Sequence, residues 1–205
     1  MDLVLISHRG NEEHDYKENT IDAIVFSLNR EYVEGVEFDI QITKDNVIVL
    51  NHDYKYENKV IKETNYDLLK LDKLEDLLSR IDTKKLLLIE LKSKKYDIDF
   101  INELDKLLSK YDYLNIKLCS FNYKLIKYIK KNTNYECGLI IGEKLNRFRF
   151  INKLDFNSCK HIYLKKYKHI DYIWTVNDIE VYKKIKSLNK KIHIITDIPH
   201  KLKDI

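Results

Sequence analysis

The chain has 205 residues, of which 44% are hydrophobic, so it is long and apolar enough to bury the core of one domain, expected to span residues 1–205. Its 37 basic and 33 acidic residues leave a net charge of only +4, which argues against a nucleic-acid-binding protein. No run of about 18 apolar residues occurs, so no transmembrane segment is expected.

Short apolar segments rich in β-branched residues alternate with segments of helical periodicity along the chain. In chain order, strands are predicted at residues 3–7, 36–40, 47–50, 86–91, 116–120, 137–141, 161–164, 172–176 and 192–196. Helices are predicted at residues 20–31, 73–81, 98–110, 123–131, 146–154 and 179–188. Such alternation is typical of parallel strands joined by crossover connections.

The third predicted strand is the exception to this alternation. Only six residues separate Ile40 from Val47, whereas a parallel crossover needs about a dozen or more. Residues 44–46 read Lys-Asp-Asn, which is typical of a turn, so this strand should fold back antiparallel on the second one. Position 39 would then lie opposite position 51 or 52, which brings His52 close to Asp39.

Removing this hairpin from the count leaves eight parallel strands. The expected fold class is therefore α/β, a (β/α)8 TIM barrel with a β-hairpin excursion after strand two. A chain of 205 residues is at the small end for that fold, so some helices must be short. The link around residues 165–170 is too short for a full helix.

Polar side chains lie at or near the C-terminal ends of the first three parallel strands and of the hairpin, where barrel active sites form. They are His8, Arg9, Glu37, Asp39, His52, Glu90 and Lys92. Glu37 and Asp39 are two residues apart and share one face of their strand, as do Glu90 and Lys92. Glu90 follows four apolar residues, an unfavourable place for a carboxylate unless a cation neutralises it.

These residue types together indicate phosphodiester chemistry. Three inward carboxylates, Glu37, Asp39 and Glu90, form a hard oxygen site that suits Mg²⁺ or Ca²⁺. Two histidines beside such a metal suit general acid–base work, because the histidine pKa lies near neutrality. Arginine binds phosphate by a fork and lysine as a point charge, which are the expected roles of Arg9 and Lys92.

The order of motifs resembles that of the glycerophosphodiester phosphodiesterase family. The motifs are His8-Arg9-Gly10, Glu18-Asn19-Thr20, Glu37-Phe38-Asp39, Thr43-Lys44-Asp45-Asn46, His52-Asp53, Glu90-Leu91-Lys92, Ser120-Phe121, Trp174-Thr175-Val176-Asn177 and Thr196-Asp197-Ile198-Pro199. They span residues 8–199, nearly the whole chain. The family is similar to other barrel phosphodiesterases, including phosphoinositide-specific phospholipase C and spider sphingomyelinase D.

The resemblance implies an enzyme that converts a glycerophosphodiester, a small-molecule substrate, into glycerol 3-phosphate and an alcohol. It implies catalytic roles for His8 and His52, and a divalent metal, Mg²⁺ or Ca²⁺, as cofactor. It also implies the following ligands: Glu37, Asp39 and Glu90 for the metal, Arg9 and Lys92 for the phosphate, and Trp174 for the substrate pocket. Which histidine is the acid, and whether water or a substrate hydroxyl attacks, stay open.

The sequence departs from the family in two motifs and one length. Lys17 replaces the proline before Glu18-Asn19-Thr20, and Asn46 replaces a turn glycine, which asparagine can do because it tolerates positive φ. The region between His52 and Glu90 is shorter than in many relatives, which bears on substrate choice. Within the Glu18–Thr20 motif, we expect a helix cap at Asn19 or Thr20, and Glu18 beside Arg9.

Two other functions stay open at this point. One is a lysophospholipase D or sphingomyelinase D-like phosphodiesterase, and the other is a non-catalytic barrel that binds phosphodiesters. A cytoplasmic location is expected, because the start of the chain leaves no room for a signal peptide and the cysteines lack zinc or disulfide spacing. The headgroup and the oligomeric state stay open as well.

Overall fold

The structure is a computed structural model that describes residues 3–12, 15–142, 153–166, 170–188 and 190–205. Eight parallel strands form a closed barrel, because β1 pairs with both β2 and β11. The strands are β1 (Val4–His8), β2 (Gly35–Ile42), β6 (Leu86–Leu91), β7 (Ile116–Ser120), β8 (Glu136–Ile141), β9 (Phe156–Lys160), β10 (Tyr172–Trp174) and β11 (His193–Thr196). The predicted (β/α)8 TIM barrel is confirmed.

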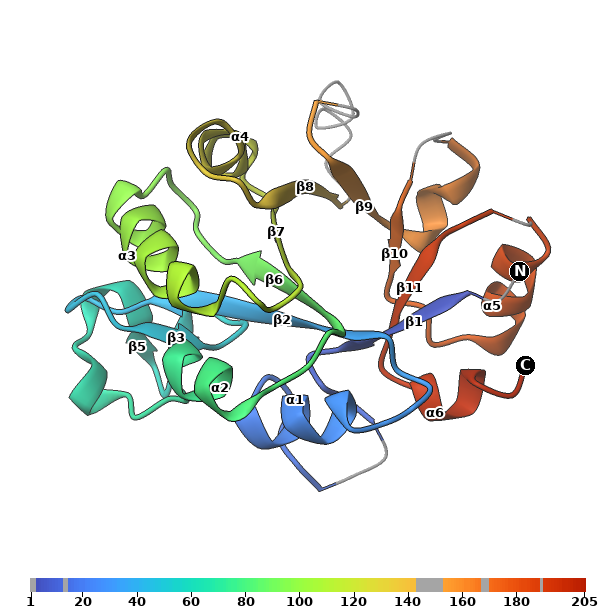
Figure 1. Ribbon diagram of the computed structural model, residues 1–205, viewed down its shortest axis with the longest axis horizontal. Helices are drawn as coiled ribbons and strands as arrows, with labels where there is room; N and C mark the ends of the chain where they lie inside the picture. Colours follow the sequence, from blue (N-terminus) through green and yellow to red (C-terminus); the bar gives the residue numbers. More distant parts are fainter. Residues whose placement is uncertain (1–2, 13–14, 143–152, 167–169, 189) are drawn as a thin grey trace.

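Helices lie around the outside of this barrel (Figure 1). They are α1 (Ile21–Leu28), α2 (Leu74–Arg80), α3 (Ile98–Leu108), α4 (Tyr123–Asn132), α5 (Ile179–Lys186) and α6 (Pro199–Leu202). The first five match predicted helices, α6 was not predicted, and the predicted helix 146–154 falls mostly outside the described residues. Within the described chain, every helix is too short or too polar to cross a bilayer.

Alternation along the strands separates two apolar layers. On β2, Val36, Phe38 and Ile40 point outward and join the cluster that packs under α1 to α4. On β6, Leu88 points inward with Cys119 and other apolar residues of the barrel interior. Since side chains alternate, Glu37, Asp39 and Glu90 share the inward face, and the register sets Asp39 directly beside Glu90.

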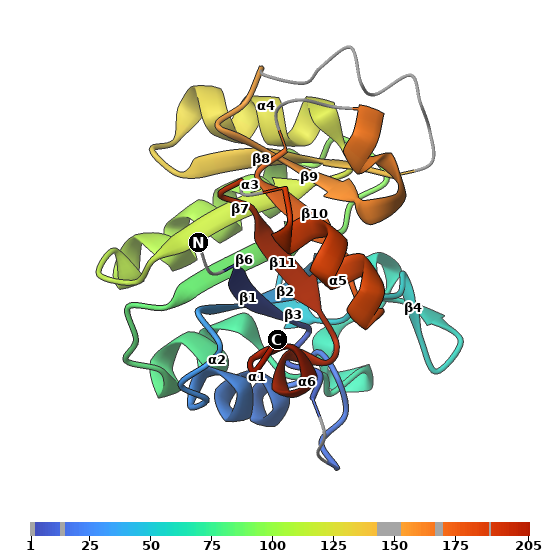
Figure 2. The same cartoon turned by 90° about the vertical axis from the view of Figure 1, so that its right-hand side faces the viewer.

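The predicted hairpin is present. β3 (Ile48–Leu50) runs antiparallel to β2, with Ile40 opposite Leu50, and the Asn51 amide donates to the Asp39 carbonyl at 3.2 Å. Asn46 takes the positive φ of 63° that the turn requires. A second, unpredicted hairpin follows, β4 (Lys55–Tyr56) and β5 (Lys59–Val60), and stands off the barrel (Figure 2). Short 3-10 turns complete the connections at Ile61–Glu63, Tyr66–Leu68 and Ser109–Tyr111.

The prediction of a strand at residues 161–164 is wrong. The strand is β9 (Phe156–Lys160), and His161–Lys166 form a 3-10 helix on the way to β10. Asn157 and Ser158 are adjacent, polar and buried in β9, so this strand lacks the apolar pattern on which the strand predictions depend. The Asn157 amide also donates to the Asp171 carboxylate at 2.8 Å, which ties the strand to its neighbour.

Candidate active site

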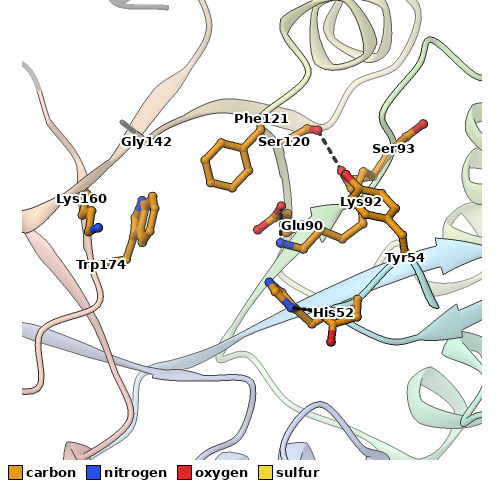
Figure 3. A pocket seen from close by; sticks show the side chains of 12 residues that line it. His52, Tyr54, Glu90, Lys92, Ser93, Ser120, Phe121, Gly142, Lys160 and Trp174 are labelled. Carbon is orange, nitrogen blue, oxygen red and sulfur yellow. Dashed lines mark hydrogen bonds and ion pairs between the residues drawn. The ribbon is translucent and has the colours of Figure 1, made fainter. Parts of the chain in front are cut away.

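The structure brings the predicted site residues together at the C-terminal end of the barrel. An inner cavity of about 130 Å³ is lined by seven of these eight residues: His8, Arg9, Glu37, His52, Glu90, Lys92 and Trp174. The eighth, Asp39, lies behind them and is 1% exposed. An outer cavity of about 420 Å³ shares His52, Glu90, Lys92 and Trp174 with the inner one (Figure 3).

Three buried carboxylates form the centre of the site. Glu37, Asp39 and Glu90 each offer an oxygen within 4.8 Å of the others. Glu37 Oε2 accepts no hydrogen bond from a described residue, and His8 Nε2 lies 3.8 Å from it. Buried oxygens without donors, in a set of three carboxylates, fit a hard divalent cation such as Mg²⁺ or Ca²⁺.

The pKa values of these carboxyl groups are far from those in water. Burial, followed by the charges of Asp39 and Glu90, raises the pKa of Glu37 well above its ordinary value. Burial and the charge of Asp39 raise the pKa of Glu90 to about 8. A bound cation would oppose both pKa shifts, since it favours the ionised carboxylate.

Two basic side chains flank Asp39. Arg9 Nε lies 3.0 Å from Asp39 Oδ2, and Lys92 Nζ lies 3.1 Å from Asp39 Oδ1 and 2.8 Å from Glu90 Oε1. Neither Asp39 carboxylate oxygen accepts a hydrogen bond from a described residue, so the two contacts with Asp39 are ion pairs only. Burial opposes the charge of Lys92, but Glu90 and Asp39 outweigh it and raise the Lys92 pKa. The ammonium group therefore stays charged.

The loop after β1 holds Arg9 in place. Arg9 and Gly10 have positive φ values of 55° and 69°, and the Arg9 Nη1 atom lies 2.7 Å from Glu18 Oε1, as expected. The Asn19 side chain makes two hydrogen bonds to the backbone of Asp39. Its Oδ1 accepts from the Asp39 amide at 2.8 Å, and its Nδ2 donates to the Asp39 carbonyl at 3.0 Å. Thr20 caps α1 by accepting from the Ala23 amide at 3.4 Å. This motif therefore joins the loop to β2 and begins the first helix.

His8 is oriented by residues that the sequence analysis did not assign to the site. Its Nδ1 lies 2.6 Å from Asp197 Oδ1, next to the end of β11. Asn177 donates to the other Asp197 oxygen and accepts from the Asp197 amide at 2.9 Å. Burial opposes ionisation of Asp197, but the hydrogen bonds and the charge of His8 lower its pKa. With Nδ1 bound to Asp197, His8 Nε2 is the atom that faces Glu37.

His52 lies on the opposite side, in the loop that follows β3. Its Nδ1 lies 2.8 Å from Asp53 Oδ1, and its ring points toward the Lys92 ammonium group (Figure 3). The buried amide of Gln41 donates to the carbonyls of Asn51 (2.9 Å) and Asp53, on either side of His52. Desolvation and the charge of Lys92 lower the His52 pKa against the opposing effect of Asp39.

An aromatic wall bounds both cavities on the side of β7 and β10. Phe121 and Trp174 meet edge to face, with ring centroids 5.8 Å apart and an interplanar angle of 84°. Lys160 ends β9 and is the register partner of Trp174, so the two side chains are neighbours on the rim. Sequence reasoning placed Trp174 in a pocket but missed Lys160, because it was assigned to no strand.

Comparisons with known proteins find relatives of one family. The model of the glycerophosphoryl diester phosphodiesterase family matches residues 8–75. The YhdW protein of Bacillus subtilis, named as a candidate glycerophosphodiester phosphodiesterase, is 26% identical over 237 aligned positions, which cover 96% of this chain and 95% of the relative. The resemblance to this family, seen in the motifs, is thereby confirmed.

Solved structures of similar fold carry the same family name. A glycerophosphodiester phosphodiesterase of Parabacteroides distasonis superposes with a TM-score of 0.85 at 22% identity, covering 98% of this chain and 95% of that one. One of Thermotoga maritima superposes with a TM-score of 0.77 at 21% identity, covering 96% and 95%. At such identities the likeness shows that the fold is shared.

Proposed function

This chain is a relative of the glycerophosphoryl diester phosphodiesterase family, and on that premise we propose that it hydrolyses glycerophosphodiesters to glycerol 3-phosphate and an alcohol. The observation that carries the proposal is the buried cluster of Glu37, Asp39 and Glu90, with a histidine on either side. An acidic cluster alone is common, but here it shares one cavity with two basic side chains that suit a phosphate.

Glu37, Asp39 and Glu90 would hold the divalent cation, Mg²⁺ or Ca²⁺. Once bound, the cation polarises a phosphoryl oxygen and offsets its negative charge. The unpartnered Glu37 oxygen and the raised pKa values of Glu37 and Glu90 support this assignment. Arg9 and Lys92 would bind the remaining phosphoryl oxygens, since both stay charged at the edge of the inner cavity.

His8 and His52 would divide the acid and base roles between them. One accepts the proton of the attacking water or substrate hydroxyl, and the other protonates the oxygen of the departing alcohol. Asp197 fixes the His8 ring through Nδ1 and leaves Nε2 for proton exchange. Asp53 does the same for His52. Trp174 would line the substrate pocket beside them.

We also propose that the enzyme works in the cytoplasm, in the turnover of glycerol phosphate groups from lipid. Cys119, Cys137 and Cys159 are buried free thiols, which suits a reducing compartment. Cell fractionation with an antibody against the chain tests the location independently of the activity.

The decisive test measures glycerol 3-phosphate release from glycerophosphocholine, glycerophosphoethanolamine and glycerophosphoglycerol. We expect EDTA to abolish turnover and Mg²⁺ or Ca²⁺ to restore it. His52→Ala should lower kcat by about 10²-fold or more, because an acid–base group typically contributes that much. His161→Ala is the matched control, since His161 lines neither cavity.

Two outcomes would contradict the proposal. Turnover that survives EDTA would exclude the metal role of the carboxylate cluster. Turnover that survives His52→Ala, in a variant whose circular dichroism is unchanged, would exclude the proposed acid–base pair.

A further inference from the structure

A buried carboxyl group lies behind the loop that follows β1, outside both cavities of the site. Glu12 is 8% exposed and lines neither cavity. Tyr32 Oη donates to its Oε2 at 2.8 Å, and the hydroxyl group of Ser27 on α1 donates to its Oε1. Burying a carboxyl group is costly unless hydrogen-bond donors compensate it, so these two hydroxyl groups hold Glu12 in place.

Ser27 also links Glu12 to β1. Ser27 Oγ lies 2.8 Å from Ser7 Oγ, and Ser7 Oγ donates to the Asn11 carbonyl at 3.1 Å. Ser7 directly precedes His8, and the Asn11 amide donates to the His8 carbonyl at 2.8 Å. Ser7 and Glu12 thus hold the two ends of one turn, residues 8–11, against the same serine of α1.

The turn between these two contacts has an uncommon backbone conformation. Arg9 and Gly10 have successive positive φ values of 55° and 69°, and positive φ is unfavourable for arginine. A Cβ atom at Gly10 would lie 2.6 Å from the carbonyl carbon of Ala23, so the turn lies directly on the first part of α1. Such conformations persist only where the surrounding structure fixes them. Glu12 provides that support on the C-terminal side of the turn.

We propose that Glu12 is a positioning residue for the phosphodiester reaction and that it acts through Arg9. The Arg9 side chain extends from this turn into the site, where its Nε lies 3.0 Å from Asp39 Oδ2 and its Nη1 lies 2.7 Å from Glu18 Oε1. If the turn relaxed, the guanidinium group would move away from the phosphate that it is proposed to bind. This role rests on the proposed function and extends it to a residue outside the cavities.

The first test is Glu12→Met, which has a similar length but cannot accept hydrogen bonds from the two hydroxyl groups. With Mg²⁺ or Ca²⁺ added, and with the glycerophosphodiester that the wild type hydrolyses fastest, kcat/KM should fall by about tenfold or more, because a small displacement of a binding group has effects of this size. The inhibition constant of the product, glycerol 3-phosphate, should rise as well, since Arg9 would bind its phosphate.

Two variants serve as controls for this measurement. Glu12→Gln keeps an oxygen that can accept a hydrogen bond, so it should retain most of the wild-type kcat/KM. Glu31→Met makes the same change at an exposed position next to Tyr32 and should leave kcat/KM and the inhibition constant unchanged.

A double-mutant cycle with Arg9→Ala separates positioning from a general effect on the fold. If Glu12 acts through Arg9, Glu12→Met should lower kcat/KM by less than about threefold once Arg9 is replaced, because the effects of coupled residues do not add. A residue that only stabilises the fold would have the same effect on kcat/KM in both backgrounds.

Tyr32→Phe provides the same cycle if Glu12→Met does not fold. It removes one of the two donors to Glu12 and keeps the aromatic ring. Its kcat/KM should fall by about threefold, as expected for the loss of one hydrogen bond, and this decrease should disappear in the Arg9→Ala background.

The outcomes separate this inference from the proposed function. A wild-type kcat/KM in folded Glu12→Met, or equal losses with and without Arg9, would overturn the positioning role and leave the phosphodiesterase function standing. Absence of wild-type turnover with any headgroup and either metal would overturn both.

Discussion

Glu37 and Glu90 are carboxyl groups that the fold keeps from ionising freely. Each is almost fully buried, and each faces the charge of Asp39. Lys92 and Arg9 offset part of this repulsion, but the pKa values of both glutamates still lie above their ordinary values. Without a metal ion, burying these two carboxyl groups therefore lowers the free energy of unfolding at the pH at which the enzyme would work.

This conflict predicts how the stability of the metal-free protein depends on pH. Because the folded pKa values are raised, the folded state keeps protons that the unfolded chain loses above about pH 4.5. The contribution of these two groups to the free energy of unfolding is therefore largest below that pH, and it is lost as the pH rises through the folded value of about 8 for Glu90. Thermal unfolding in EDTA should show a Tm that decreases across this range.

Glu90→Gln serves as the matched variant for this measurement, because glutamine resembles the protonated acid. In EDTA at pH 8 its Tm should exceed that of the wild type by about 2 °C or more, and the two should converge near pH 5. A wild-type Tm that does not change between pH 5 and 9 would contradict the proposal that the ionised glutamates destabilise the metal-free fold. A Glu90→Gln variant with a lower Tm than the wild type at pH 8 would contradict it as well.

β2 supplies the site from three successive inward or rim positions. Glu37 and Asp39 enter the cluster, and Gln41 reaches across to the loop that carries His52. Gln41 is buried, and its amide is the donor for the carbonyls of Asn51 and Asp53. One strand thus fixes the distance between the metal ligands and a proposed acid–base group.

We predict that Gln41→Met lowers kcat by about tenfold or more, because a small displacement of a catalytic group has effects of this size. Methionine has a similar length but cannot donate, so two carbonyls lose their partner at a cost of about 1–3 kcal/mol. Steady-state kinetics together with thermal unfolding separate the two effects. A variant that is less stable but retains full kcat would show that Gln41 supports the fold alone.

The helices and strands also show which parts of the fold and of the site could be predicted from the sequence. The hairpin between β2 and β3 follows from a turn and a short connection, which are local features. β9 was missed because Ser158, which lines the inner cavity, and its neighbour Asn157 are both polar. The strand therefore lacks the continuous apolar pattern by which the other strands were predicted. The pairing of His8 with Asp197 joins residues 189 positions apart and requires the barrel to close.

At the scale of the whole molecule, the site lies across the seam where the barrel closes. β1 pairs with β2 on one side and with β11 on the other. His8 on β1 contacts Glu37 on β2 and Asp197 after β11, so the same residue links the first and last parts of the chain. Glu37, Asp39 and Glu90 converge from β2 and β6 in the folded barrel, so a ligand of these three carboxylates should stabilise the folded state.

Cation binding should raise the Tm in proportion to the logarithm of its concentration. At a concentration of about 100 times Kd, binding to the folded state alone adds about 2.7 kcal/mol. For a chain of this size, that corresponds to an increase of about 5–10 °C. Thermal unfolding of the EDTA-treated protein, titrated with Mg²⁺ and with Ca²⁺, measures this increase and ranks the two ions.

Glu37→Gln tests whether the ion binds at the cluster. Glu37 Oε2 accepts no hydrogen bond from a described residue, so the substitution should not lower the Tm of the metal-free protein. It removes one ligand charge and should abolish most of the increase on adding the cation. Asp204→Asn is the control, because it removes an exposed charge near the C-terminus and should keep the full increase. An equal increase in all three proteins would mean that the cation binds elsewhere, and the three carboxylates would then need another explanation for their shared burial.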